Sequence, residues 1–146
     1  MNIIETVSAN MLQVRSGLLP NQEDLLKVME AEPWLCSWGL VNILLCKSYN
    51  IDIEQERKSL RRYNIRGFLH SSEWLGLCKI QKRVNTRIPS SYTLKHLAEE
   101  WCNEYISNGA FIAAVIHLGI PYRAYIDSPN IHVALATKSR LLKESS

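Results

Sequence analysis

Ten basic residues lie between positions 57 and 95, and this stretch is the strongest chemical signal in the 146-residue chain. Its only acid is Glu73, so ten positive charges face one negative charge and the balance is +9. A block of this density repels itself unless the fold spreads it or a polyanion neutralises it. The stretch therefore indicates nucleic acid, or an acidic protein surface, as a partner.

The predicted contact residues come from one face of a helix and from a loop that leads into a second helix. Arg and Lys neutralise phosphates, while Ser, Thr and Asn add hydrogen bonds that position a nucleic acid without reading its sequence. The predicted nucleic-acid or polyanion site consists of Lys58, Arg61, Arg62, Lys82, Arg83, Asn85, Thr86, Arg87, Ser90, Lys95 and His96. A solvated surface whose cations pair with acids elsewhere in the chain is the competing interpretation.

Motifs of the common enzyme classes are missing, since the chain holds no GxSxG, HExxH, GxxxxGK[ST] or GxGxxG. Cys36 is the one alternative nucleophile, because it lies near a predicted helix start and His96 or His132 can serve as its base. A cysteine beside tryptophans in an apolar run is more typical of a core. We therefore expect no catalytic residue and no enzymatic activity.

The cysteines and histidines do not form a metal motif. The four cysteines are spaced 10, 32 and 24 residues apart, with no CxxC pair, and the four histidines are scattered singly. The first residues, MNIIETVSAN, show no secretory signal, and no apolar run is long enough to span a bilayer. We expect free thiols in a reducing cytoplasm, with no metal, no cofactor and no membrane contact.

The composition is that of a globular protein, with 47% hydrophobic and 21% charged residues. We predict one domain over residues 1–146. Residues 1–56 form an acidic helical half, with eight acids against three bases and a balance of −5. Residues 57–95 are the basic stretch described above, and residues 91–137 form two helices and a hairpin.

Caps and apolar periodicity predict the elements that position these residues. In the first half, Asn21 caps a helix that Pro33 closes, and Asp52 caps another. Two further helices are predicted over 37–48 and 72–82, and a loop over 83–91. In the second half, Ser91 begins an amphipathic helix, and Ser107 begins an apolar helix that ends before Gly119.

Two strands, 122–126 and 131–137, close the chain around a turn at 127–130. The fold class is mainly α (α+β), a helical domain with a C-terminal β-hairpin. A winged helix-turn-helix has the same order of elements. The predicted core consists of Leu40, Val41, Leu44, Trp74, Leu94, Leu97, Trp101, Phe111, Ile112, Val115 and Ile116.

Residues 85–130 resemble a segment shared by small uncharacterised proteins of bacterial phages and mobile elements. The resemblance lies in Asn85-Thr86-Arg87, in SYTLKH from Ser91, in YISNGAFIAA from Tyr105, and in Ser128-Pro129-Asn130. It implies a mobile-element setting, in which small proteins bind nucleic acid or block a host machine.

Two functions follow from these observations. The first is a non-enzymatic accessory protein that binds nucleic acid through the basic surface. The alternative is a protein-binding inhibitor or adaptor that acts on a host machine, for example an inhibitor of a defence system.

Overall fold

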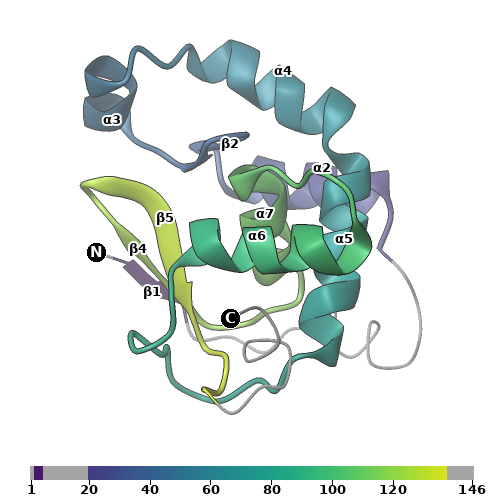
Figure 1. The fold of residues 1–146 in the computed structure, drawn as a ribbon. Helices are drawn as coiled ribbons and strands as arrows, with labels where there is room; N and C mark the ends of the chain where they lie inside the picture. The colour runs from purple at the N-terminus through teal and green to yellow at the C-terminus, as the bar shows by residue number, and fades with distance from the viewer. Residues whose placement is uncertain (1, 5–19, 138–146) are drawn as a thin grey trace.

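The computed structural model describes residues 2–4 and 20–137, which Figure 1 shows as a set of helices beside a small sheet. Within the described residues the order is β1 (Asn2–Ile4), α2 (Gln22–Ala31), β2 (Leu35–Cys36), β3 (Gly39–Leu40), α3 (Ile43–Ser48), α4 (Ile53–Tyr63), α5 (Ile65–Leu77), α6 (Ser91–Cys102), α7 (Asn108–His117), β4 (Tyr122–Tyr125) and β5 (Ser128–Val133). The mainly helical fold with a C-terminal hairpin is confirmed. No helix in the described part is both long and apolar enough to cross a membrane.

Helix α7 lies at the centre of the fold, where α2, α5 and α6 contact it (Figure 1). All of its residues except Ile116 are buried. The Ser107 hydroxyl caps it as predicted, accepting a hydrogen bond from the Ala110 N–H at 3.0 Å. A recognition helix must expose a polar face to the DNA major groove. The winged helix-turn-helix alternative is therefore wrong for α7.

A three-stranded antiparallel sheet with the order β1-β4-β5 covers one side of the helices (Figure 1). Tyr125 pairs with Ser128, so Ile126 and Asp127 form the hairpin turn. The second strand accordingly begins at Ser128 rather than at Ile131 as predicted. Residues Ser128 to Asn130 belong to β5 and not to the turn, which places them on the sheet edge near α6 and α7.

The predicted helix over 37–48 is only half present. Its first part is instead a two-stranded hairpin, in which Cys36 pairs with Gly39 and Leu35 with Leu40. Gly39 has φ = +129°, a conformation that side chains rarely adopt and that no α-helix uses. The helix α3 starts only after Asn42, whose side chain accepts a hydrogen bond from the Leu45 N–H at 2.9 Å.

Helix α5 begins at Ile65, well before the predicted start at Ser72. Ser72 resembles a cap in sequence, but its hydroxyl donates to the Phe68 carbonyl one turn earlier, which is a bond that a residue inside a helix makes. The predicted caps of α2 and α4 are confirmed. Asn21 and Asp24 form a reciprocal capping box, and Asp52 accepts from the Gln55 N–H.

Helix α6 buries Leu94 and Ala98 as its apolar pattern predicts, but its buried face also includes two polar residues. The buried residues are Ser91, Leu94, Lys95 and Ala98. Trp101, placed in the core by the sequence, is 41% exposed, and Leu44 on α3 is also exposed. A tryptophan covers so much area that it satisfies an apolar pattern without being enclosed.

We expect Trp101→Ala to lower the free energy of unfolding by about 1 to 2 kcal/mol, less than the roughly 3 to 5 kcal/mol of a fully buried large ring. The control is Trp74→Ala, because Trp74 is only 1% exposed and packs against Phe111. Urea denaturation followed by circular dichroism compares the two. Equal losses of unfolding free energy in both variants would mean that Trp101 is packed in the core as tightly as Trp74.

Candidate functional site

Three of the ten basic residues between 57 and 95 are occupied by partners within the chain. The Arg57 guanidinium donates to the carbonyls of Met29, Glu32 and Leu35 at 2.8–3.0 Å, and so caps the end of α2. Arg66 forms a two-pronged ion pair with Glu104. Lys95 pairs with Glu99. The competing interpretation, in which acids of the chain pair with the cations, therefore holds for Arg66 and Lys95, whereas Arg57 is held by backbone carbonyls.

The remaining seven cations fall into two separate groups. Lys58, Arg61 and Arg62 lie on α4, whereas Lys79, Lys82, Arg83 and Arg87 lie in the connection between α5 and α6. Helix α5 has 13 residues, which corresponds to about 20 Å, and it separates the two groups. Figure 1 shows α4 at the top and this connection at the bottom. The cations of the helix face and those of the loop, predicted to form one contact site, therefore do not lie together.

Residues 79–87, which we call the basic segment, are held by backbone hydrogen bonds to the end of the sheet. The N–H of Gln81 donates to the Ala134 carbonyl at 2.9 Å, and that of Asn85 donates to the Val133 carbonyl at 3.0 Å. The N–H of Ala136 donates to the Lys79 carbonyl at 2.8 Å. These bonds fix the segment beside the residues that follow β5. Its cations thus have a defined position on a rigid support.

Asn85 has a structural role in the basic segment and is not a surface contact. It is buried, and its amide donates to the Leu135 carbonyl and to the Thr137 hydroxyl, each at 2.9 Å. Its side-chain oxygen accepts from the Arg87 N–H at 3.0 Å. The sequence placed Asn85 among the binding residues because an isolated Asn in a polar loop resembles an exposed donor. It positions Arg87 instead.

The exposed part of the segment is strongly cationic. Lys79, Lys82, Arg83, Thr86 and Arg87 are all exposed. None of these four cations forms an ion pair with another described residue. The sequence from 74 to 98 contains no acid. The segment therefore has a formal charge of +4 and no ion-paired acid among the described residues.

The start of α6 adds a further anion-binding feature beside Arg87. Ser90 stands at the N-cap, but its half-buried side chain makes no capping hydrogen bond, and Ser91 accepts from the Ile131 N–H at 3.0 Å. The first N–H groups of the helix thus lack a side-chain cap, and the positive end of the helix dipole lies next to the basic segment.

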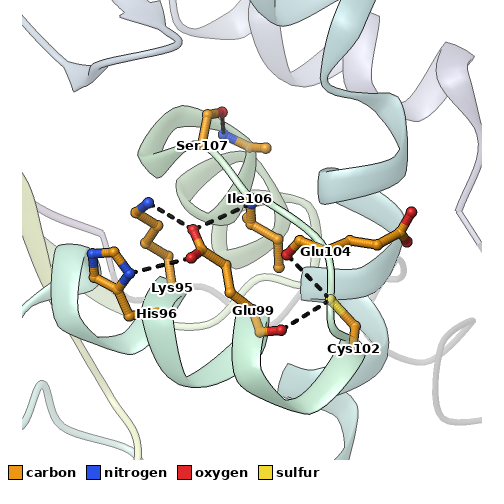
Figure 2. A network of polar contacts seen from close by, with 8 residues as sticks. Lys95, His96, Glu99, Cys102, Glu104, Ile106 and Ser107 are labelled. Atoms are coloured by element: carbon orange, nitrogen blue, oxygen red, sulfur yellow. Dashed lines mark hydrogen bonds and ion pairs between the residues drawn. The ribbon is translucent and has the colours of Figure 1, made fainter.

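Lys95 does not extend the exposed patch, contrary to the prediction. It is only 5% exposed, and Figure 2 shows its ammonium group directed at Glu99, with a separation of 2.7 Å. A hydrophobic pattern treats lysine as a surface residue, but a carboxylate one helical turn later lets the charge be buried. His96 is half-buried, and its Nδ1 lies 3.2 Å from the Glu99 carboxylate.

Glu99 joins α6 to the start of α7. Besides Lys95 and His96, it accepts from the Ile106 N–H at 3.3 Å, in the loop that ends at the Ser107 cap (Figure 2). Partial burial alone would raise the pKa of Glu99, but the hydrogen bonds from Lys95 and Ile106 outweigh burial and lower it. Glu99 is therefore ionised at neutral pH and fixes the position of Lys95.

Lys95 lines a hollow of about 620 Å³ that we call the pocket. The walls of the pocket come from the β2–β3 connection, the end of α3, α4, α6, the start of α7 and the start of β5. Trp38, Tyr49, Tyr92 and Tyr105 supply aromatic surface. The pocket was not predicted from the sequence, because the residues that line it are far apart in the chain and share no motif.

Thiol chemistry at Cys36 finds no support in the structure. Its side chain is fully buried in a small apolar cluster with Val41 and Leu45. Burial raises the pKa of the Cys36 thiol to about 11, so it is protonated at neutral pH. His132, a predicted base, lies in β5 beside Tyr125, with the phenol oxygen 2.7 Å from Nδ1. Among the described residues, no three His, Cys, Asp or Glu side chains are grouped to hold a metal ion.

Comparison of the chain with protein-family models, curated proteins and solved structures found no match in any of the three. The resemblance of residues 85–130 to phage and mobile-element proteins stays a prediction. Only the geometry of the described residues therefore bears on what the site binds.

Proposed function

We propose that this protein binds single-stranded nucleic acid through the basic segment, as a non-enzymatic accessory protein in the phage or mobile-element setting that the resemblance implies. The observation that carries the proposal is the group of four exposed cations, fixed by backbone hydrogen bonds and free of acidic neighbours in sequence. Such a group neutralises phosphates and releases their counterions.

Two features favour a single strand over a duplex. Helix α7 is buried, so the hairpin-flanked helix that would enter a major groove is not accessible. Tyr92 follows the basic segment at the start of α6 and is exposed, so it can stack on an unpaired base. Bases are available for stacking only when they are not paired within a duplex.

The test is a matched pair of charge reversals. K82E/R87E changes two exposed cations of the basic segment, and K58E/R62E changes two exposed cations of α4 by the same total charge. We expect K82E/R87E to weaken binding of a labelled single-stranded oligonucleotide by roughly two orders of magnitude at low salt, and K58E/R62E to weaken it much less. Fluorescence anisotropy measures both affinities.

Equal losses in the two variants would mean that only net charge matters and that the basic segment is not the site. Both variants should keep the circular dichroism spectrum and melting temperature of the wild type, since all four side chains are exposed. A loss of affinity is then a loss of contact and not of folding.

A protein-binding adaptor is the second candidate, and a specific surface favours it. Helix α3 and the β4–β5 turn border a shallow hollow of about 300 Å³, and the Asn42 amide joins them by donating to the Ile126 carbonyl at 2.9 Å. Ile43, Leu44 and Ile126 are exposed there. Clustered exposed apolar side chains are typical of protein contact sites. A nuclease-insensitive partner captured by the wild type but lost in Leu44→Glu would select this function.

A further inference from the structure

We propose that the pocket binds one nucleotide of the strand, with the base between aromatic side chains and the phosphate at Lys95. That the bound nucleotide is part of a strand rests on the proposed function. A volume of about 620 Å³ is within the range of small-molecule sites. Tyr92 belongs to the pocket and also follows the basic segment, so the two sites adjoin along the chain.

The aromatic lining fits a planar base. Trp38 and Tyr49 lie with their ring centroids 5.9 Å apart at an angle of 41°, and Tyr105 and Tyr92 line the pocket from the side of α6. All four rings are exposed rather than enclosed in the core. Large aromatic side chains that surround one hollow and still face solvent offer stacking surface to a ligand.

Lys95 supplies hydrogen-bond donors for a phosphate. Its ammonium lies 5.3 Å from the centroid of the Tyr92 ring and 4.8 Å from that of Tyr105, so it sits between two aromatic faces. An ammonium has three donors, and among the described residues this one donates a hydrogen bond only to Glu99. Glu99 balances the charge of Lys95, but the other N–H groups of the ammonium lie on the pocket wall and can donate to phosphate oxygens.

Asn108 supplies an acceptor for the base. It is 6% exposed, and its amide nitrogen is committed to the Trp38 carbonyl at 2.8 Å and to Asn130 Oδ1 at 2.9 Å. These bonds fix the orientation of the amide, and its Oδ1 is buried without a hydrogen-bond partner among the described residues. An orphaned buried oxygen is costly unless a ligand donor satisfies it. An amino or ring N–H of a base is such a donor.

The acids of the lining limit the charge of the ligand. Glu56, which accepts from the Ser37 hydroxyl, and Asp127 both line the pocket, so its fixed negative charges outnumber Lys95. A triphosphate would meet much stronger repulsion there than a single phosphate, which adds the least negative charge. The structure therefore assigns a monophosphate unit, as found within a strand.

Binding of adenosine 5′-monophosphate (AMP), adenosine and ribose 5-phosphate, measured by calorimetry and by amide chemical shifts, tests the inference. We expect AMP to bind with the largest shifts at Trp38, Lys95 and Asn108, and each fragment to bind about tenfold or more weakly. Tyr105→Ala should weaken AMP binding about tenfold, whereas Tyr63→Ala, an equally exposed tyrosine outside the pocket, should leave it unchanged.

The outcomes separate the two proposals. Absence of AMP binding, or shifts confined to the basic segment, would overturn the nucleotide pocket while oligonucleotide binding by the basic segment still stands. AMP binding that persists in K82E/R87E, with no oligonucleotide binding in the wild type, would overturn the proposed function and keep the pocket. Adenosine triphosphate binding as tight as AMP would contradict the charge argument.

Discussion

Gly109→Ala should leave little folded protein. A Cβ at this position would lie 1.8 Å from the Cys36 carbonyl oxygen and 2.7 Å from its carbon, both backbone atoms that cannot rotate away. The Gly109 N–H also donates to the Ser37 carbonyl at 3.0 Å, so the start of α7 and the end of β2 are joined at this point. We expect a loss of about 4 kcal/mol or more, beyond the roughly 1 to 3 kcal/mol of ordinary overpacking.

Urea denaturation followed by circular dichroism measures this loss. The control is Gly76→Ala, because Gly76 is an exposed residue of α5 and alanine there should stabilise the helix by about 0.5 to 1 kcal/mol. A Gly109→Ala protein as stable as the wild type would show that α7 and β2 are not in close contact. Asn108, which precedes Gly109 at the start of α7, would then not be held against the β2–β3 connection in the pocket.

Glu99→Gln should destabilise the protein by about 3 kcal/mol at neutral pH, because it leaves the Lys95 ammonium buried without a compensating charge. The pKa of Glu99 is lowered in the folded state. A depressed folded pKa gives stability that is present above the unfolded pKa and is lost as the pH falls through the folded pKa. The wild type should thus lose this contribution below about pH 4.5, the ordinary pKa of a glutamate side chain.

The gap in stability between the wild type and Glu99→Gln should therefore narrow in acid. Urea midpoints at neutral and acidic pH measure it, with Glu100→Gln as the control, since Glu100 is exposed on the same helix. A gap that stays constant with pH would mean that the Glu99 charge is not what holds Lys95.

Local signals in the sequence predicted a large part of this fold. The caps of α2, α4 and α7 were visible as side chains at fixed spacing, because a cap bonds to N–H groups two or three residues away. The buried character of α7 was equally visible in its apolar run. These features depend on neighbours in the chain, which a sequence displays directly.

Features that depend on distant partners were not predictable in the same way. Gly39 bends the chain where an apolar pattern predicts a helix. A Cβ at this position would lie only 2.3 Å from the Pro129 carbonyl oxygen, so the close approach of a distant strand requires glycine here. Lys95 is buried because Glu99 neutralises it, and the pattern of apolar residues does not register that pair. The predicted cations of α4 and of the basic segment lie close in sequence but are separated by the length of α5.

The dependence of oligonucleotide affinity on salt tests the central claim most directly. Four exposed cations on a single strand predict a slope of about −2.8 for the logarithm of the association constant against the logarithm of the salt concentration. In K82E/R87E the slope should fall to about −1.4 or less, while K58E/R62E keeps the wild-type value. A wild-type slope near zero, or one that K82E/R87E leaves unchanged, would contradict nucleic-acid binding by the basic segment.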